Sequence, residues 1–385
     1  MLIGIDASRA FISQRTGTEN YSYCLIKAFT RIDKKNSYRL YTHGVTEEKI
    51  DVDLPPNFSV ENISWGRFWT QGGLALATIK NPPDILFIPA HTLPLLRELS
   101  RNKTRTVVTI HDLGYEYLPN YYHIPNFLYL NKSTEWAVKW ANALIAVSEA
   151  TRIDLINKMH CDSKKIFVVH EGVDITKFKN QNSKIKKDFI FRKYGIGEKY
   201  ILFVGTIQPR KNLERLIEAF SLVRKSFGNL DLELIIIGKP GWMYEPILVA
   251  PKKYGVEEYV RFLNFVPEED LVLLYRYAQV FCLPSLFEGF GLPVLEAMAS
   301  GCPVVVSDSS SLPEIVGDAG IHVDTLSYIS IASGIKRILG NDTLRNSLIV
   351  KGRQRVREFT WEKTAKRTLA VFEKTRYRGN KETAG

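Results

Sequence analysis

Apolar runs of strand length recur along the chain, and each is followed by a segment whose apolar residues have helical spacing. A run that is apolar at every position suits a strand covered on both faces, as in a parallel sheet flanked by helices. The alternation predicts a doubly wound α/β architecture, and it occurs twice. The predicted strands are 2–6, 85–89, 105–112, 143–148 and 165–170, then 200–205, 232–238, 279–285 and 303–308.

Two helices follow from spacing alone. Apolar residues within 21–32 and within 213–223 recur at intervals of three and four, so each set lies on one helical face. Between the two halves, residues 177–197 are polar and rich in lysine. We therefore place a domain boundary near residue 175, with an N-terminal domain over 1–174 and a C-terminal domain over 175–360.

Composition narrows the class of protein. The 385 residues are 45% hydrophobic and 24% charged, which suits a folded chain of about two to three domains. No apolar stretch approaches the roughly 18 residues that span a bilayer, and Asp6 interrupts the N-terminal apolar run that a signal peptide would need. The four cysteines are scattered without a CxxC pair, which favours a reducing, cytoplasmic location over a disulfide framework or a zinc site.

The positive charge is concentrated near the C-terminus. The net charge is +11, and residues 336–381 hold fourteen Lys or Arg against four Asp or Glu. This pattern fits a solvated helical face, and it also fits attraction to an anionic lipid surface or a nucleic acid. Because no known nucleic-acid motif accompanies the charge, we expect no nucleic-acid partner.

The first candidate for chemistry is the loop GTIQPRKN (205–212), which follows a predicted strand. Ligands of open parallel sheets bind beyond the carboxyl ends of the strands. Gly205 permits close backbone approach, and Asn212 is a suitable cap for the next helix, whose free amides attract an anion. Arg210 can bind phosphate oxygens through two hydrogen bonds, with Lys211 as a point charge beside it. The loop predicts a diphosphate site; the alternative is a solvated basic pair.

The second candidate is LFEGFGLPVLEAMASG (286–301), which also follows a strand. Pro293 suits a first helical turn, and Gly289 and Gly291 leave the preceding amides open to a ligand. Glu288 lies in the loop and Glu296 inside the helix, so they would hold separate parts of a ligand. Since carboxylates accept hydrogen bonds from hydroxyls, a sugar and a ribose are predicted. The alternative is one capping carboxylate and one surface glutamate.

Two further residues are weaker candidates, and three known motifs are excluded. Gly17, in the loop 15–21, would let backbone amides meet a phosphate, and His111 stands at the end of a predicted strand. The sequence GFG (289–291) lacks the third glycine of a dinucleotide fingerprint, and no P-loop occurs. Residues 51–53 have DxD spacing, but no predicted helix or strand positions them, so we interpret them as a solvated turn.

Together these motifs resemble a known family. Glu288 and Glu296, separated by seven residues, resemble the EX7E signature of retaining nucleotide-sugar glycosyltransferases of family four. GTIQPRKN resembles the phosphate loop of that family, SSLPEIVGDAG (310–320) its next segment, and EGVD (171–174) its interdomain turn. The similarity runs nearly end to end and is strongest over 200–320.

The resemblance implies a GT-B fold, in which two Rossmann-like doubly wound parallel-sheet domains face a central cleft. The final helix, around 361–376, would return to the N-terminal, acceptor-binding domain, so that residues 361–385 join it. The C-terminal domain would bind the nucleotide sugar. We expect no divalent metal and no other cofactor.

The resemblance also implies roles for individual residues. Arg210 and Lys211 would bind the donor diphosphate, Glu296 the ribose, and Glu288 the donor sugar, with help from the backbone of Phe290 and Gly291. The expected catalytic residues are Arg210, Lys211, Glu288 and His111, with His111 contacting the sugar. The expected donor-binding residues are Gly17, Gly205, Arg210, Lys211, Lys239, Val266, Glu288, Gly289, Phe290, Gly291, Leu292 and Glu296, with Lys239 and Val266 lining the base pocket.

Two further segments resemble particular members of the family and so indicate which donor sugar and acceptor to expect. TIHDLGYEYLP (109–119) and IIIGKPGW (235–242) are similar to members that transfer mannose from GDP-mannose. A UDP-sugar transferase, a nucleotide-sugar epimerase or hydrolase and a nucleotide-sugar sensor remain alternatives. The acceptor would be a saccharide or lipid-linked saccharide of polysaccharide or lipopolysaccharide biosynthesis, held at 93–105 and 115–130. Their basic and aromatic residues suit peripheral contact with the inner membrane face, or a buried aromatic core.

Overall fold

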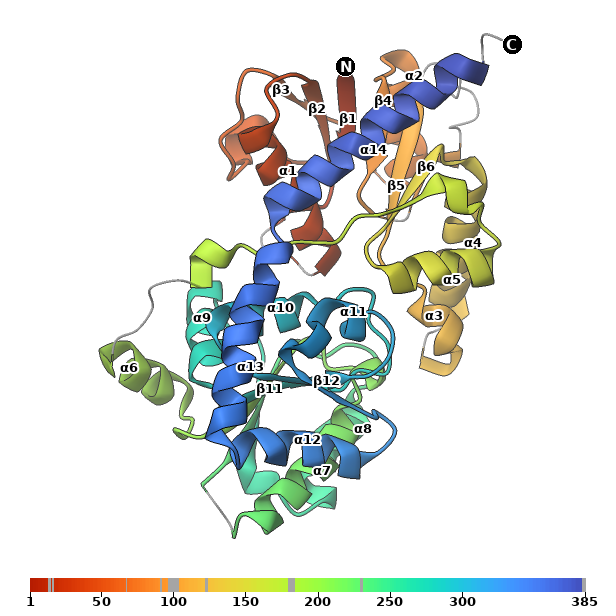
Figure 1. Cartoon of the computed structure of the whole chain (residues 1–385). Helices are drawn as coiled ribbons and strands as arrows, with labels where there is room; N and C mark the ends of the chain where they lie inside the picture. Colours follow the sequence, from red (N-terminus) through yellow and green to blue (C-terminus); the bar gives the residue numbers. More distant parts are fainter. Residues whose placement is uncertain are drawn as a thin grey trace. The chain divides into compact units, whose positions relative to one another are not determined.

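The structure is a computed structural model that describes residues 1–12, 15, 17–66, 68–90, 92–95, 104–121, 124–178, 184–228 and 231–382. It divides into two compact units. The first unit contains residues 1–116, 123–172 and 361–385, and the second contains 117–122 and 173–360. Figure 1 shows the helices and strands of each unit.

The first unit is built on a seven-stranded parallel sheet in the order β3-β2-β1-β4-β5-β6-β7. Helices α1 and α14 lie side by side against it (Figure 1). The strands are β1 (Leu2–Asp6), β2 (Ser37–Thr42), β3 (Phe58–Asn62), β4 (Ile85–Ile88), β5 (Arg105–Ile110), β6 (Ala143–Ala146) and β7 (Ile166–Val168). The α-helices are α1 (Gly17–Ile32), α2 (Ala75–Lys80), α3 (Gly114–Tyr117), α4 (Ile124–Trp140), α5 (Glu149–Met159) and α14 (Trp361–Glu382).

The second unit has a six-stranded parallel sheet in the order β10-β9-β8-β11-β12-β13. The strands are β8 (Tyr200–Val204), β9 (Glu233–Ile237), β10 (Val260–Leu263), β11 (Val280–Leu283), β12 (Val304–Ser307) and β13 (Ile321–Val323). The α-helices are α6 (Lys184–Tyr194), α7 (Leu213–Ser226), α8 (Glu245–Lys253), α9 (Glu268–Tyr277), α10 (Leu292–Ser300), α11 (Leu312–Val316), α12 (Tyr328–Leu339) and α13 (Asp342–Arg355).

Short helical turns connect these elements. One is a π-helical turn, η2 (Thr70–Leu74), which leads into α2. The 3-10 turns are η1 (Glu47–Lys49), η4 (Pro119–Tyr121), η5 (Ser163–Lys165), η6 (Ile175–Phe178), η7 (Pro209–Lys211), η8 (Glu257–Tyr259), η9 (Gly317–Ala319) and η10 (Val356–Glu358).

The predicted strands are confirmed, with ends trimmed by one or two residues, and the two predicted helices are α1 and α7. Four strands were not predicted. Three of them, β3, β10 and β13, lie at sheet edges, and β2 is next to an edge. Their sequences mix polar with apolar residues, as in Val260–Leu263 where Arg261 is exposed, so no continuous apolar run marks them.

The polar boundary segment contains more structure than its composition indicates. Residues 184–194 form α6, which packs on α9 and buries Ile190 and Phe191. The cysteines Cys24, Cys161, Cys282 and Cys302 are all buried and unbridged, as expected for small core residues. Within the described residues, no helix has the length and apolar character needed to cross a bilayer.

Strand order determines where a ligand can bind. In the first sheet, β2 and β3 lie on one side of β1, and the chain then returns to place β4 on the other side. In the second sheet, β9 and β10 lie on one side of β8, and β11 lies on the other. The winding direction thus changes between β1 and β4 and between β8 and β11. The connections on the two sides of such a point diverge and leave a crevice beyond the carboxyl ends of the strands. The loops GTIQPRKN and LFEGFG follow β8 and β11, so both lie at the crevice of the second unit.

Close backbone approach brings neighbouring loops together at this edge. Gly238, which follows β9, has φ +158°, and a Cβ atom there would lie 1.9 Å from the carbonyl oxygen of Gly205. A side chain at position 238 would therefore block the approach of this turn to Gly205. That Gly205 admits a ligand stays a prediction.

Replacing Gly238 should thus be costly. We expect Gly238→Ala to lower the free energy of unfolding of the second unit by about 3 kcal/mol, because backbone atoms must separate to admit the methyl group. Gly228→Ala is the control, since Gly228 also has positive φ but its Cβ would meet open space; strain alone costs about 1 kcal/mol. Urea unfolding followed by circular dichroism measures both, and equal losses would contradict the steric explanation.

Candidate active site

Two loops meet at the crevice of the second unit. The loop after β8 contains the turn η7, and the loop after β11 runs into α10. The amide of Leu286 donates to the carbonyl of Arg210 at 2.9 Å, so the loops are joined by their backbones. The sequence placed both loops at strand ends, and the structure brings them into contact.

Three charged side chains of these loops form a buried cluster. Lys211 Nζ donates to Glu288 Oε1 at 2.6 Å, and Arg210 Nη1 lies 3.3 Å from Glu288 Oε2 and donates to the carbonyl of Phe287 at 2.7 Å. Ser285 Oγ donates to the same Oε1 at 2.6 Å. The three charged side chains are only 8–13% exposed. Two cations and one anion therefore share a site largely removed from water.

The cluster keeps Glu288 ionised. Burial by itself would raise the pKa of Glu288, but the charges of Lys211 and Arg210 and the hydrogen bonds from Lys211 and Ser285 outweigh it and hold that pKa below its ordinary value. The cluster carries one excess positive charge. An anionic ligand that approaches it meets fixed cations in a region of low dielectric, where their attraction is strong.

A serine run supports the glutamate loop from β12. Ser311 Oγ donates to the carbonyls of Glu288 and Phe290, both at 3.0 Å, and Ser310 Oγ accepts from the Glu288 amide at 3.0 Å. These serines, and Ser285, were not predicted as site residues. The detectable signal was their position, because 309–311 directly follow the strand end of β12, next to β11 in the sheet.

The glycine-rich turn has the backbone that the sequence requires. Gly291 has φ +107°, and a Cβ there would lie 2.6 Å from a methyl group of Leu312. Gly289 and Phe290 are buried, and Leu292 begins α10, which places Pro293 in the first turn as expected. The turn therefore depends on glycine at 291 for both conformation and space.

Asn212 corrects one prediction. It precedes α7 but does not cap it with its side chain, because its φ of +59° turns the side chain away from the helix amides. Its Nδ2 instead donates to the carbonyls of Pro284 and Thr325, at 3.0 and 2.8 Å. Asn212 therefore ties three loops at the strand ends together.

Glu296 has different surroundings from Glu288. It lies within α10, half-buried, and accepts a hydrogen bond from the Tyr275 hydroxyl of α9 at 3.0 Å. Burial raises its pKa to about 7, although the Tyr275 hydrogen bond lowers it. Glu296 is thus neither an exposed surface residue nor a member of the cluster around Glu288.

The residues predicted for the base pocket lie at the ends of β9 and β10. Lys239 Nζ is 6.0 Å from the ring centroid of Phe265, which is 60% exposed, and Val266 beside it is buried. A separate hollow of about 420 Å³ borders the loop GTIQPRKN, between Pro209 and Leu286 on one side and α8 on the other. Lys239 and Val266 do not line this hollow.

His111 lies at the end of β5 in the first unit. Its Nδ1 is 3.0 Å from Glu171 Oε1, and its Nε2 is 2.8 Å from the carbonyl of Pro89. Burial lowers the pKa of His111, but the hydrogen bond and charge of Glu171 outweigh it and the pKa is raised. Both ring nitrogens thus face acceptors, which favours imidazolium. Glu171 was not predicted as a partner, although it belongs to the quoted EGVD segment.

Gly17 begins α1 and is exposed, with no atom within 4 Å of the position of a Cβ. Packing therefore does not explain a glycine here. Among the described residues, no group of three or more His, Cys, Asp or Glu is arranged to hold a metal ion. Whether a metal takes part stays a prediction.

The raised pKa of Glu296 should appear in the pH dependence of stability. Its folded pKa of about 7 exceeds the ordinary value of 4.5, so the folded state binds the extra proton between these values and stability falls as pH rises from 4.5 to 7. Glu296→Gln should remove about 1–3 kcal/mol of this fall. Unfolding titrations at pH 5 and 8 measure it. The exposed Glu245→Gln is the control, and an unchanged slope in Glu296→Gln would refute the assignment.

Comparison with known proteins identifies the family. The family described as "Glycosyl transferases group 1" matches residues 186–355, and "Glycosyltransferase Family 4" matches 15–177. The chain is 31% identical to the O-antigen chain mannosyltransferase B of Escherichia coli, over 93% of this chain and 96% of that protein. Its fold is similar to sucrose-phosphate synthase from Thermosynechococcus elongatus (TM-score 0.77, 18% identity, 97% and 98% of the chains).

A second solved structure is that of Anabaena HepE in complex with UDP and glucose (TM-score 0.74, 16% identity, 97% and 99% of the chains). Both solved structures are similar to this chain in fold, and this similarity agrees with its two α/β units, each built on a parallel sheet. The sequence relationship covers nearly the whole chain and agrees with the crevice and its buried cations. The chain belongs to glycosyltransferase family 4 and has the GT-B fold.

Proposed function

We propose that the chain transfers mannose from GDP-mannose, with retention of anomeric configuration, to a saccharide or lipid-linked saccharide acceptor. The observation that carries this proposal is the buried cluster of Arg210, Lys211 and Glu288 at the strand-order crevice. The name of the O-antigen chain mannosyltransferase supports mannose as the sugar and glycan biosynthesis as the setting.

The cluster suits departure of a diphosphate. As the anomeric C–O bond breaks, positive charge develops on the sugar and negative charge on the diphosphate. Arg210 and Lys211 are held in place before the reaction, so they stabilise the leaving group without reorganising. In the donor complex these cations would turn part of their interaction from Glu288 to the phosphates, and the carboxylate would become available to the sugar hydroxyls.

The proton of the acceptor needs a destination. The acceptor oxygen forms the new bond to the anomeric carbon while its proton passes to an oxygen of the leaving phosphate on the same face. This step balances without a protein base and gives retention. It also requires no metal, because fixed cations already face the phosphate. Glu296 would bind the ribose, and its raised pKa lets it donate as well as accept a hydrogen bond near pH 7.

The other candidate functions are supported to different degrees. A UDP-sugar donor remains the second candidate, because the fold is shared with HepE, whose structure contains UDP and glucose. An epimerase, a hydrolase or a sensor would not need an acceptor surface, and the named relative is a transferase.

The acceptor surface we propose belongs to the first unit. On α4, Ile124, Leu128 and Tyr129 are more than half exposed, and Tyr129 shares a hydrogen bond of 2.8 Å with Thr92. Tyr115 of the same region is buried, so the predicted aromatic belt is part core and part surface. Residues 96–103 and 122–123 of the predicted acceptor segments lie outside the described residues.

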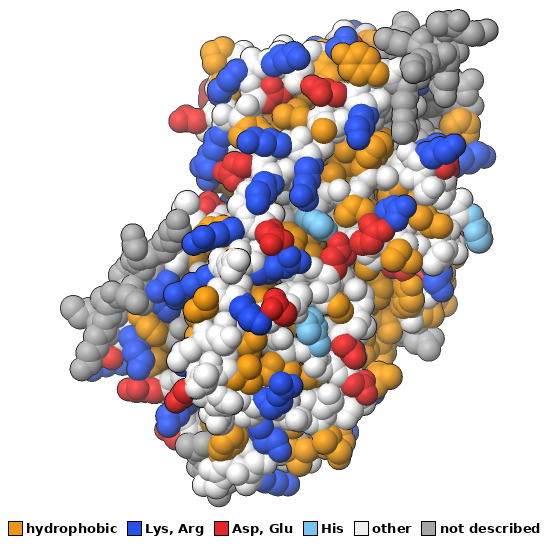
Figure 2. All heavy atoms as spheres, in the orientation of Figure 1, with side chains coloured by type: hydrophobic (Ala, Val, Ile, Leu, Met, Phe, Trp, Pro, Cys, Tyr) orange, Lys and Arg blue, Asp and Glu red, His pale blue; other side chains and the backbone are white. Residues whose placement is uncertain are grey.

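Basic side chains are exposed elsewhere on the first unit, along α14. Lys363, Lys366, Arg367 and Lys374 are exposed, and Figure 2 shows Lys and Arg side chains gathered on the face that carries α14. Exposed lysines and arginines attract an anionic membrane surface. We therefore propose a cytoplasmic enzyme that meets a lipid-linked acceptor at the membrane surface.

The donor can be identified by binding and by products. We expect GDP and GDP-mannose to raise the melting temperature more than UDP, UDP-glucose or ADP-glucose do, because a ligand that binds the folded state stabilises it. Incubation of GDP-mannose with an oligosaccharide acceptor should give an elongated product of α configuration, identified by mass spectrometry and NMR. Stabilisation by UDP-glucose alone would establish the second candidate, and a product of inverted configuration would refute retention.

Removal of the cluster lysine should affect turnover. We expect Lys211→Ala to lower kcat by 10²-fold or more, on the order of 3 kcal/mol of transition-state stabilisation. Lys225→Ala, on the exposed side of α7, is the matched control. Circular dichroism and melting curves would verify that both variants fold. Near-normal turnover in folded Lys211→Ala would remove the phosphate-loop assignment.

A further inference from the structure

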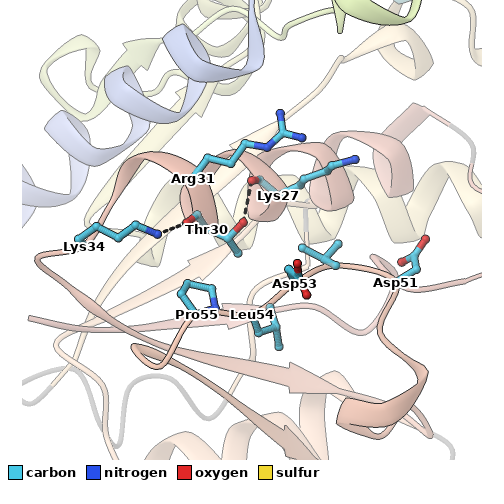
Figure 3. A pocket seen from close by; sticks show the side chains of 9 residues that line it. Lys27, Thr30, Arg31, Lys34, Asp51, Asp53, Leu54 and Pro55 are labelled. Atoms are coloured by element: carbon cyan, nitrogen blue, oxygen red, sulfur yellow. Dashed lines mark hydrogen bonds between the residues drawn. The ribbon is translucent and has the colours of Figure 1, made fainter.

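A hollow of about 660 Å³ lies in the first unit, between the second half of α1 and the loop that precedes β3 (Figure 3). Lys27 and Arg31 line it from α1, Lys34 lines it from just beyond the end of that helix, and Asp51 and Asp53 line it from the loop. None of the residues predicted for donor binding borders it. The segment 51–53, expected to be a solvated turn, is exposed at Asp51 and Asp53 but forms one wall of this hollow.

We propose that the hollow is a secondary saccharide site, which holds sugars of the acceptor chain at a distance from the reacting end. This inference rests on the proposed function as a transferase that acts on saccharides. It assigns a role to residues that the reaction itself does not use.

The opposed charges of the two walls indicate the class of ligand. Lys27 and Arg31 are four residues apart and so lie on one side of α1, and Lys34 lies just past the end of this helix. Figure 3 shows Asp53 and Pro55 across the hollow from this helix. An anion would be repelled by the carboxylates and a cation by the basic groups. A sugar hydroxyl both donates and accepts hydrogen bonds, so a neutral saccharide can use both walls.

The charged groups are held loosely enough to exchange partners. Arg31 lies 3.9 Å from Glu362, and Asp51 lies 3.5 Å from Arg15, with all four side chains partly or largely exposed. Exposed ion pairs of this kind contribute little to stability. Lys34 Nζ donates to the carbonyl of Thr30 at 2.6 Å. A ligand can therefore replace these contacts at low cost.

The floor of the hollow adds apolar surface. Val52, Leu54 and Pro55 are half-buried and line it beside the carboxylates. Ligand sites typically combine apolar walls with a few polar groups that fix orientation. A pyranose ring has the same mixture, with C–H groups on its faces and hydroxyls at its edge.

The hollow is too far from Gly17 to hold the reacting sugar. Gly17 begins α1, and about fourteen residues separate it from Arg31, which corresponds to about 20 Å of helix at about 1.5 Å per residue. A saccharide bound there would be tethered to the enzyme by a part that does not react. Tethering raises the effective concentration of the reacting end, so it should lower KM for long acceptors and leave kcat unchanged.

The site can be tested by direct binding. The variant is Lys27→Ala combined with Asp53→Asn, one change on each wall. The matched control is Lys35→Ala combined with Glu48→Gln, which alters the same charges on exposed residues of neighbouring segments that do not line the hollow. The probe is a linear α-linked mannose tetrasaccharide, titrated without donor and followed by NMR. We expect the variant to raise Kd by about tenfold or more, and the control to leave it unchanged.

Steady-state kinetics with acceptors of different length tests the same site independently. With acceptors of one to six sugars, the KM advantage of the longer acceptors should disappear in the variant while kcat stays at the wild-type value. Equal tetrasaccharide binding by the variant and wild type, or no binding by wild type, would overturn the proposal. Binding of inorganic phosphate that is lost in Lys27→Ala but kept in Asp53→Asn would overturn the assignment to a neutral saccharide.

These outcomes are separable from those of the proposed function. Donor binding is measured by melting temperature with GDP and UDP sugars, and the hollow is measured without donor. If GDP-mannose fails but the tetrasaccharide binds in a Lys27- and Asp53-dependent manner, the secondary site stands and the donor assignment falls. If transfer from GDP-mannose occurs but the variant binds and elongates long acceptors normally, the donor assignment stands and the secondary site falls.

Discussion

The interaction on which the site depends is the buried contact of Glu288 with Lys211 and Arg210. Removing such charges from water costs several kcal/mol for each ion unless partners compensate. Compensation here comes from loops of three neighbouring strands: Ser285 binds the carboxylate, and Ser310 and Ser311 bind the backbone on either side of it. The cluster therefore fixes the loops as much as the loops fix the cluster, and the protein itself holds these charges in place.

Strand order explains why these residues meet although they are distant in sequence. Lys211 and Glu288 are 77 residues apart, yet β8 and β11 are hydrogen-bonded neighbours. Parallel pairing aligns the carboxyl ends of the strands, and the change of winding direction between them leaves room for a ligand. Gly238 then permits the close approach of two backbone segments, and Gly291 leaves room for the Leu312 side chain. The strand order thus brings these side chains together at one edge of the sheet, and glycine occupies the positions where neighbouring atoms leave no room for a side chain.

Sequence reasoning recovered the parts of the fold that are apolar on both faces and the loops that follow them. It missed β2, β3, β10 and β13, because edge and near-edge strands carry polar residues, and it missed α6, whose lysines hide the buried Ile190 and Phe191. Residue type and strand-end position predicted that Arg210, Lys211 and Glu288 lie at one site, and the structure brings them together; their roles toward a donor stay predictions. Residue type and position did not indicate Ser285, Ser310 and Glu171, whose contacts run across the sheet, or the backbone conformation of Asn212.

The last helix has a consequence for biosynthesis. Phe372 of α14 is fully buried in the first unit, with its ring 5.2 Å from that of Phe87. A ribosome delivers residues 173–360 before this ring emerges, so part of the apolar surface of the first unit stays uncovered until α14 has been synthesised. A nascent chain stalled before Trp361 would be the form most in need of a chaperone. The second unit, contiguous apart from residues 117–122, is free to complete its fold earlier.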